Sequence, residues 1–281
     1  MTAIKIVTDS TVDLTDAELK KLDLTIVPLN INFEHENFID GVTITKEEFI
    51  KKMSESQTLP KTSQPSIGEF VEVYNDLTSD GSTVISIHLT DVISGTINAA
   101  QQAAQLADGD VRVINSKMTS RGLARQVLRA CELSQTDASV SEILTEIQKV
   151  HDKTFLYLDV IHLDNLVKGG RISKAAGLIS NLLNIKVFMQ LTDTTLVTIG
   201  KGRGMKVVQK HFDLLRKDYL SSGKAIKAID FAHAGLSQFN QAIIDSYKKS
   251  FPNIPITVTF TSPVITTHTG ADAMAIIIEE L

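Results

Sequence analysis

Residues 83–115 read TVISIHLTDVISGTINAAQQAAQLADGDVRVIN, and this stretch decides the class of fold. Apolar and β-branched residues at 83–89 predict a strand. An alanine- and glutamine-rich pattern from about Ser94 predicts a helix, and Val111–Asn115 predicts a second strand. A strand, a helix and a strand in this order imply a parallel crossover, so we expect a parallel sheet with helices on both faces.

The same alternation extends toward the N-terminus and on to residue 150. Residues 4–7 and 25–33 are expected to be strands, and Asp40-Gly41 is expected to form a hairpin turn. The Ser/Thr-x-x-Glu pattern of a capping box, which opens helices, occurs at residues 15–18, 45–48 and 66–69. Two further helices are predicted near residues 119–133 and 140–150.

The second half repeats the alternation from Thr154–Val160, which predicts a strand. We therefore expect two α/β domains, residues 1–155 and 156–281, each with a mainly parallel sheet flanked by helices. The last element is predicted to be a helix after Gly270. The other expected elements are helices at 173–183, at 205–220 and after Ser237, and strands at 186–191, 196–199, 225–231 and Ile256–Phe260.

The composition excludes several classes of protein. Lys plus Arg is 28 and Asp plus Glu is 33, so the net charge of −5 offers no basic face for nucleic acid. The single cysteine, Cys131, excludes an internal disulfide. The apolar stretch at 273–278 is too short to span a bilayer, and the N-terminus reads as a strand rather than a signal peptide. We therefore expect a cytoplasmic protein.

Sequence motifs for the common cofactors are missing. The residues after the first strand are Thr8-Asp9-Ser10-Thr11 rather than the glycines of a dinucleotide site, and no phosphate-binding P-loop occurs. The hydrolase motif G-x-S-x-G is missing too, and the seven histidines lack the spacing of a zinc site. We expect neither a metal nor a cofactor.

Four segments rich in hydroxyl side chains stand at predicted strand ends or helix starts: residues 8–11, 61–66, 93–96 and 266–270. In open α/β sheets, ligands bind at the carboxyl ends of the strands, where helix N-termini offer free N–H groups to an anion. Neutral hydroxyl donors with one histidine would suit a single carboxylate. Taken singly, Thr8, Ser66 and Ser94 are better explained as caps and turn residues.

Five blocks in the same order along the chain favour a binding role for these segments. They are VTDST at 7–11, TSQPSIGEF at 62–70, ISGT at 93–96, KGGRI at 168–172 and HTG at 268–270. With these blocks the sequence resembles the DegV family, bacterial fatty-acid-binding proteins that serve as the binding subunit of fatty acid kinase. The resemblance covers essentially the whole chain. It implies two α/β domains with one long-chain fatty acid buried between them.

The resemblance also implies which residues bind the carboxylate. Thr62 and Ser94 would bind it directly, with Ser63 and Gly95 beside them in the same two blocks. From the HTG block, His268 and Thr269 would lie close to the head group.

The chain departs from the family pattern at two places. Thr267 precedes the HTG block where glycine is common, and Ala271-Asp272 follows it where Pro-Gly is common. Asp272 would either repel a bound carboxylate or stabilise the N-terminus of the last predicted helix. The ISGT block continues with Ile97-Asn98 where an aromatic residue is common.

By this resemblance the protein is a carrier rather than an enzyme. It would present a palmitate-like fatty acid to a separate fatty acid kinase and hold the acyl-phosphate for lipid metabolism, which implies transient contact with a membrane. Arg171 and Arg203 are candidates for docking the kinase. Arg203 belongs to the run GKGRG at 200–204, for which a glycine-rich turn with solvated charges is the simpler explanation.

Two other functions stay open at this point. An acyl-transfer or ester-hydrolysing enzyme would use Ser94 as nucleophile and His268 as base, oriented by Asp272 or Asp9. A phosphate-sugar-binding regulator would use residues 200–204. The apolar candidates for a tail pocket, which are as typical of an ordinary core, are Leu158, Ile161, Phe188 and Met189.

Overall fold

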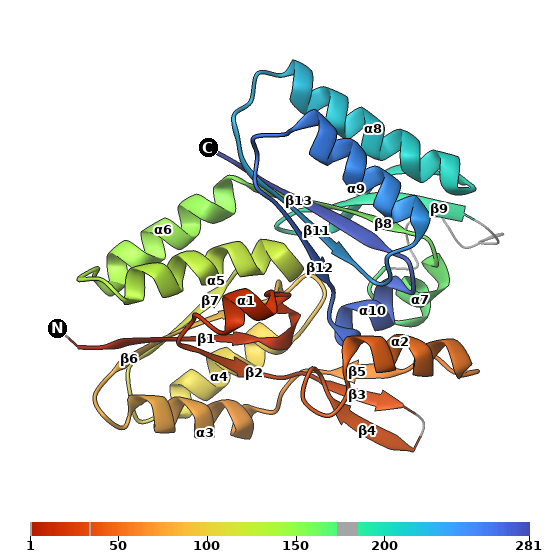
Figure 1. Ribbon diagram of the computed structural model, residues 1–281. Coiled ribbons are helices and arrows are strands. Elements are labelled where there is room, and N and C mark those ends of the chain that lie inside the picture. Colours follow the sequence, from red (N-terminus) through yellow and green to blue (C-terminus); the bar gives the residue numbers. More distant parts are fainter. Residues whose placement is uncertain (1, 34, 173–184) are drawn as a thin grey trace. The chain divides into compact units, whose positions relative to one another are not determined.

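Four strands of the first half pair in parallel, as the crossover pattern predicts. The computed structural model describes residues 2–33, 35–172 and 185–281 (Figure 1). Its first sheet has the order β2-β1-β6-β7, and each neighbouring pair is parallel. These strands are β1 (Ile4–Asp9), β2 (Leu24–Val27), β6 (Thr83–His88) and β7 (Val111–Asn115).

Alternating side chains bury both faces of this sheet. The helices that cover it are α3 (Ile67–Thr78), α4 (Thr96–Leu106), α5 (Ser120–Ser134) and α6 (Val140–Asp152). Ile6 and Ile85 pack in one core with α5 and α6, whereas Val7 and Val84 point the other way and pack with α3 and α4. The predicted α/β class, with a parallel sheet flanked by helices, is confirmed.

Residues 25–33 form two strands rather than the single strand that the sequence predicted. Pro28 separates β2 from β3, because proline has no N–H to donate to a sheet ladder. The second of these strands belongs to a separate sheet of order β4-β3-β5. The elements of this region are η1 (Ser10–Val12), α1 (Asp16–Leu19), β3 (Asn30–Phe33), β4 (Glu36–Ile39), α2 (Lys46–Glu55) and β5 (Lys61–Ser63).

The predicted hairpin turn at Asp40-Gly41 is also wrong. These residues follow β4, the second strand of the β3–β4 pair, and so stand after the hairpin rather than at its turn. The N–H groups of Val42 and Thr43 both donate to Ile39 O, which directs the chain toward α2. Gly41 has φ +72°, a conformation that favours glycine.

The second half forms a six-stranded sheet of order β10-β9-β8-β13-β11-β12. Among the described strands, four of its five neighbouring pairs are antiparallel and only β11–β12 is parallel, so the expectation of a mainly parallel sheet here is corrected. The cause is topological, since β9 and β10 form a hairpin and β13 inserts between β8 and β11. The strands are β8 (Thr154–Val160), β9 (Ile185–Leu191), β10 (Leu196–Arg203), β11 (Ile226–His233), β12 (Ile256–Phe260) and β13 (Met274–Glu280).

Two long helices cover one face of this sheet, α8 (Met205–Ser221) and α9 (Gln238–Ser250). Phe188, Phe231 and Ile276 of the sheet pack with Phe212 and Ile244 of these helices. Two shorter helices are α7 (Leu163–Lys168) and α10 (Pro263–Thr269). The predicted helix at 173–183 lies outside the described residues.

The last element is a strand, not the predicted helix after Gly270. The helix α10 ends before that glycine, and β13 follows it in the middle of the sheet. A short apolar run does not by itself distinguish a buried helix from a buried strand. The three consecutive isoleucines at 276–278 favour the strand, because β-branched side chains fit a sheet buried on both faces.

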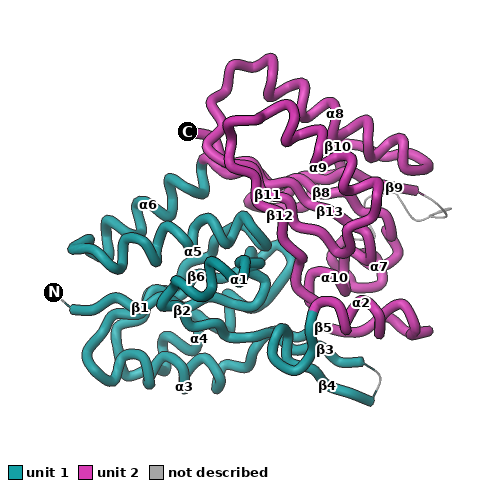
Figure 2. The backbone as a smooth tube through the Cα atoms, viewed as in Figure 1, with its two compact units in different colours: residues 1–45, 62–152 teal, residues 46–61, 153–281 magenta. Residues whose placement is uncertain are grey.

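The chain forms two compact units, which Figure 2 distinguishes by colour. Unit 1 contains residues 1–45 and 62–152, and unit 2 contains residues 46–61 and 153–281. Residues 46–61 thus group with the later half, where Lys46 Nζ donates to Phe260 O at 2.7 Å. The assignment of head-group loops to residues 1–155 and of a tail pocket to residues 156–281 stays a prediction.

Candidate functional site

The TSQPS and SGT blocks meet within unit 1. Thr62 and Ser63 end the short strand β5, and Gly95 stands directly before α4. A Cβ atom added at Gly95 would lie 2.1 Å from Gln64 Oε1, so glycine at this position lets the Gln64 side chain lie against the start of α4. The two sequence blocks, about thirty residues apart, therefore form one local structure.

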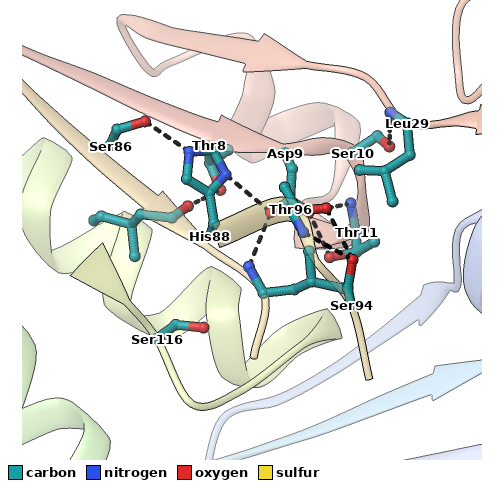
Figure 3. Close-up of polar contacts among 12 residues, drawn as sticks. Thr8, Asp9, Ser10, Thr11, Leu29, Ser86, His88, Ser94, Thr96 and Ser116 are labelled. Carbon is teal, nitrogen blue, oxygen red and sulfur yellow. Dashed lines mark hydrogen bonds and ion pairs between the residues drawn. The ribbon is translucent and has the colours of Figure 1, made fainter. Parts of the chain in front are cut away.

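Ser94 is a half-buried hydroxyl at the start of α4. Its Oγ accepts the Thr96 N–H at 3.2 Å and lies 2.9 Å from Thr96 Oγ1 (Figure 3). When the buried Thr96 hydroxyl donates in this pair, the O–H of Ser94 is left to a ligand. The first turn of α4 contains no acidic side chain, so its N-terminal N–H groups favour an anion beside Ser94.

Ser66 is a helix cap, as the simpler explanation given above predicts, whereas Thr8 is a residue of the strand β1 rather than a cap or turn residue. Ser66 is the N-cap of α3, where its Oγ accepts from Glu69 N and its own N–H donates to the Glu69 carboxylate. Thr8 is fully buried and donates to Ile87 O at 2.8 Å. Ser10 donates to the Asp40 carboxylate at 2.7 Å. Thr8 and Ser10 therefore make structural contacts within unit 1.

Beneath this region lies a buried polar network that joins the ends of β1 and β6 (Figure 3). Tyr74 OH donates to Ser86 Oγ at 2.8 Å, and Ser86 Oγ lies 2.6 Å from His88 Nε2. The other ring nitrogen, His88 Nδ1, lies 3.1 Å from Asp9 Oδ2. All four side chains are 0% exposed, so this Ser–His–Asp arrangement has no access to a substrate.

The network also bears on the enzyme hypothesis. The Asp9 carboxylate accepts from Thr11, His88 and Leu89, so it is engaged within unit 1 and is not available to orient His268. Sequence reasoning missed His88. The signal was present, since Ser86 and His88 alternate with isoleucines in a strand expected to be buried, and buried polar groups need partners.

The KGGRI and HTG blocks meet within unit 2. A Cβ atom at Gly169 would lie 2.4 Å from His268 Nδ1. A Cβ atom at Gly270, which has φ +82°, would lie 2.8 Å from His162 Cβ. Asn165 Nδ2 also donates to Thr267 O at 3.3 Å. The α7 region and the α10 region therefore pack closely against each other. The glycine at position 169 allows the His268 ring to lie against the backbone.

Burial and a neighbouring cation keep His268 neutral. Desolvation lowers its pKa to about 4, and the charge of Arg171 acts in the same direction. Arg171 is itself half-buried and donates to Gly169 O at 2.7 Å, and desolvation lowers its pKa. Thr269 is buried, and its hydroxyl donates to Ile265 O within α10. A neutral imidazole in this place can donate one hydrogen bond and accept another.

Asp272 does not stabilise a helix N-terminus, because β13 follows it instead of the predicted helix. It lies in the turn between α10 and β13 with φ +60°. Its N–H donates to Ala234 O, and its carbonyl oxygen accepts from Asn240 Nδ2, both at 2.9 Å. The backbone of this turn is thereby fixed to the residue that follows β11 and to α9.

The 200–204 run is mostly strand rather than the expected glycine-rich turn. Residues 200–203 belong to β10 and pair with β9. A Cβ atom at Gly200 would lie 2.0 Å from His211 Nε2, and one at Gly202 would lie 2.5 Å from a methyl group of Val207. These glycines make room for α8, so the run is not a loop that could surround a phosphate. Arg203 is exposed at the end of this edge strand.

The described ranges contain no group of three or more His, Cys, Asp or Glu side chains suited to a metal ion. Within those ranges no helix combines the length and the apolar character needed to cross a bilayer.

The sheets and the paired glycine- and hydroxyl-rich blocks define a two-unit α/β protein. A family model described as "Uncharacterised protein, DegV family" matches residues 3–281. The chain belongs to the DegV family, as the resemblance in its sequence predicted.

Relatives and solved structures are similar to this chain over nearly its full length. A DegV domain-containing protein of Streptococcus pneumoniae is 40% identical, with 99% of both chains covered, and one of Listeria monocytogenes is 42% identical over 98% of both. The structure is similar to DegV, a fatty acid binding protein from Bacillus subtilis, with a TM-score of 0.88 and 28% identity over 100% of both chains. A fatty-acid-binding DegV family protein from Thermus thermophilus gives 0.87 and 29%, again over 100% of both.

Proposed function

We propose that this protein binds one long-chain fatty acid. The observation that carries the proposal is the full-length similarity, at TM-scores of 0.87 and 0.88, to two DegV proteins described as fatty-acid-binding. In this proposal the hydroxyls of Thr62 and Ser94 bind the carboxylate, supported by Ser63 and Gly95. His268 and Thr269 contribute from the HTG block.

Physical chemistry gives the tail and the head group different roles. Burying a sixteen-carbon chain removes about fifteen methyl or methylene groups from water, a gross gain of about 12 kcal/mol before the costs of association. Affinity therefore comes mainly from the tail. Hydroxyls, helix N–H groups and a neutral histidine orient the carboxylate without a full opposite charge buried against it.

In the six-stranded sheet, the residues that pack with the helices α8 and α9 are separated from the candidates for a tail pocket by the face of the sheet to which they point. Phe188 packs edge-on against Phe212 of α8 and is ordinary core. Its neighbour Met189 pairs with Leu158 of β8, and both point to the opposite face of the sheet because successive side chains alternate. We retain Leu158 and Met189 as candidates for the tail pocket, together with Ile161.

The further proposal is that the protein is a cytoplasmic carrier rather than an enzyme. It presents the carboxylate to a separate fatty acid kinase and holds the resulting acyl-phosphate for lipid metabolism. Exposed Arg203 is the better candidate for kinase docking. Arg171 is half-buried beside Gly169, and its charge acts on His268, which suits a place near the head group more than one on an open surface.

The first experiment is organic extraction of the purified, undelipidated protein followed by mass spectrometry. One equivalent of a palmitate-, stearate- or oleate-like acid supports the proposal and gives the preferred chain. An empty extract, together with no thermal stabilisation by added fatty acids, would contradict it.

The head-group assignment has its own test, the double variant Thr62→Ala with Ser94→Ala. We expect it to fold and to bind fatty acid about tenfold or more weakly, because two hydrogen bonds to a charged group are lost. Ser66→Ala is the matched control, since Ser66 stands in the same block but caps α3. Unchanged affinity and unchanged kinase-coupled turnover in the double variant would remove Thr62 and Ser94 from the site.

A further inference from the structure

Asp9 accepts four hydrogen bonds although it is fully buried. Its Oδ1 accepts from Thr11 N at 3.0 Å and Thr11 Oγ1 at 2.6 Å. Its Oδ2 accepts from Leu89 N at 2.9 Å and faces His88 Nδ1 at 3.1 Å. Only an ionised carboxylate accepts from donors on both oxygens in this way. Asp9 therefore fastens the turn after β1 to the first residue after β6.

Tyr74 and Ser86, at the other end of the network from Asp9, determine which ring nitrogen of His88 carries the hydrogen. Because the Tyr74 hydroxyl donates to Ser86, the Ser86 hydroxyl keeps its own hydrogen for His88 Nε2. Nε2 is then the acceptor, and Nδ1 carries the hydrogen that points to Asp9. The imidazole is neutral in this arrangement, and every polar atom of its ring is satisfied.

Leu89 is where this network reaches the segment that contains Ser94. Residues 89–95 connect β6 to α4, and their first N–H is the one bound by Asp9. The next, Thr90 N–H, donates to Met118 O at 2.8 Å, and Asp91 forms an ion pair with Lys117 at 3.0 Å. At its end, Ser94 is held by Thr96. Of these contacts, the one to Asp9 is made by the first residue of the segment, so it fixes where the segment leaves the sheet.

We infer that Asp9 and His88 are positioning residues for Ser94, and that they set the preference of the head-group site for a carboxylate over an uncharged hydroxyl. The inference rests on the proposed function. A hydrogen bond to a carboxylate depends on donor position more strongly than burial of an apolar tail does. A shift of Ser94 therefore weakens binding of the acid more than binding of the corresponding alcohol.

The test compares palmitic acid with hexadecanol, which has the same chain and no charge, by titration of the delipidated full-length protein. In Asp9→Asn, one side-chain oxygen becomes an NH₂ group, which cannot accept the hydrogen bonds that this oxygen accepts in Asp9, so one pair of contacts breaks. We expect the affinity ratio of acid to alcohol to fall about tenfold, the effect of losing one charge-assisted hydrogen bond. Thr8→Val is the matched control, because it removes another buried β1–β6 hydrogen bond one residue away and is expected to keep the ratio.

Variants of His88 make the test specific for position. In His88→Asn the amide nitrogen replaces Nδ1 as the donor to Asp9, so the ratio should be retained, whereas His88→Ala should lower it as Asp9→Asn does. ¹⁵N spectra of the histidine ring should show a protonated Nδ1 and an unprotonated Nε2 in the unmodified protein. Equal weakening of acid and alcohol in Asp9→Asn and His88→Ala, or an unchanged ratio, would overturn the inference.

The outcome is separable from that of the proposed function. If the unmodified protein binds palmitic acid and Ser94→Ala lowers the ratio while both network variants leave it unchanged, only the inference fails. If the unmodified protein binds neither ligand, the proposed function fails. Thermal unfolding of each variant is measured alongside, and His88→Ala serves should Asp9→Asn not fold.

Discussion

At the scale of single residues, glycine allows close approaches between the sequence blocks of this chain. Gly95 lies against Gln64, and Gly169 lies against His268, both at distances that leave no room for a Cβ atom. Gly169 has φ −72°, which any residue adopts, so its requirement is purely steric. A substitution at Gly169 therefore tests, without backbone strain, whether fatty-acid binding depends on the position of the His268 ring.

Gly169→Ala should displace the His268 ring, because the new methyl group would lie 2.4 Å from its Nδ1 and 2.9 Å from Asn165 O. The displaced ring would lose its proposed hydrogen bond to the carboxylate, so we expect fatty-acid affinity to fall about tenfold. Titration with palmitic acid checks this. Gly68→Ala is the control, since its nearest neighbour would be Ser66 Oγ at 3.9 Å. Full affinity in Gly169→Ala would show that His268 does not need this position.

At the scale of elements, a buried carboxyl joins β8 to β13. Asp159 is 0% exposed and accepts from Met274 N–H, and its Oδ2 has no hydrogen-bond partner among the described residues. Burial raises its pKa to about 7; the Met274 N–H and Lys186 oppose the rise, and the negative charge of Asp272 adds to it. The turn after α10 is therefore held by a carboxyl group that titrates near neutral pH.

The pKa of Asp159 predicts how stability depends on pH. The folded pKa lies above the unfolded value of about 4, so ionisation favours the unfolded chain. This contribution to stability is present below pH 4 and is lost as the pH rises to about 7. Asp159→Asn, which is always neutral, should unfold at a temperature several degrees higher than the unmodified protein at pH 8, since 1 kcal/mol corresponds to about 2–4 °C.

Thermal unfolding from pH 5 to pH 8 measures this difference, which should shrink toward pH 5. Asp193→Asn, at an exposed turn between β9 and β10, is the control and should show no such trend. A difference independent of pH would mean that Asp159 is not the titrating group.

At the scale of the whole molecule, the proposed carrier needs a surface for its kinase. Arg203 is exposed on the edge strand β10, beyond which the sheet has no further described strand. Arg203→Glu should slow association with the kinase about tenfold at low salt and leave fatty-acid binding unchanged, because an exposed charge acts mainly on encounter.

Lys217→Glu provides the comparison, since it reverses an exposed charge near the other end of α8. Association kinetics of the two variants with the kinase, at two salt concentrations, distinguish them. Equal rates for Arg203→Glu and the unmodified protein would exclude Arg203 from the docking surface.

Local patterns in the sequence determined much of the molecule. The parallel sheet of the first half follows from alternating strands and helices, and the capping boxes at Thr15 and Ser66 were read directly because they depend on residues three positions apart. The blocks containing Thr62, Ser94 and His268 were also visible in the sequence. Each of these features depends on neighbours along the chain.

The tertiary structure alone decided what depends on partners far along the chain. The isoleucines of β13 form a strand because β8 and β11 pair with them, and residues 200–203 form a strand because β9 and α8 lie beside them. His88 meets Asp9 across 79 residues. The physical reason is the same in all three cases. A buried polar group needs a hydrogen-bond partner and a buried apolar group needs a packing partner, and these partners decide the local conformation. Because the partners are distant along the chain, local sequence patterns do not identify them.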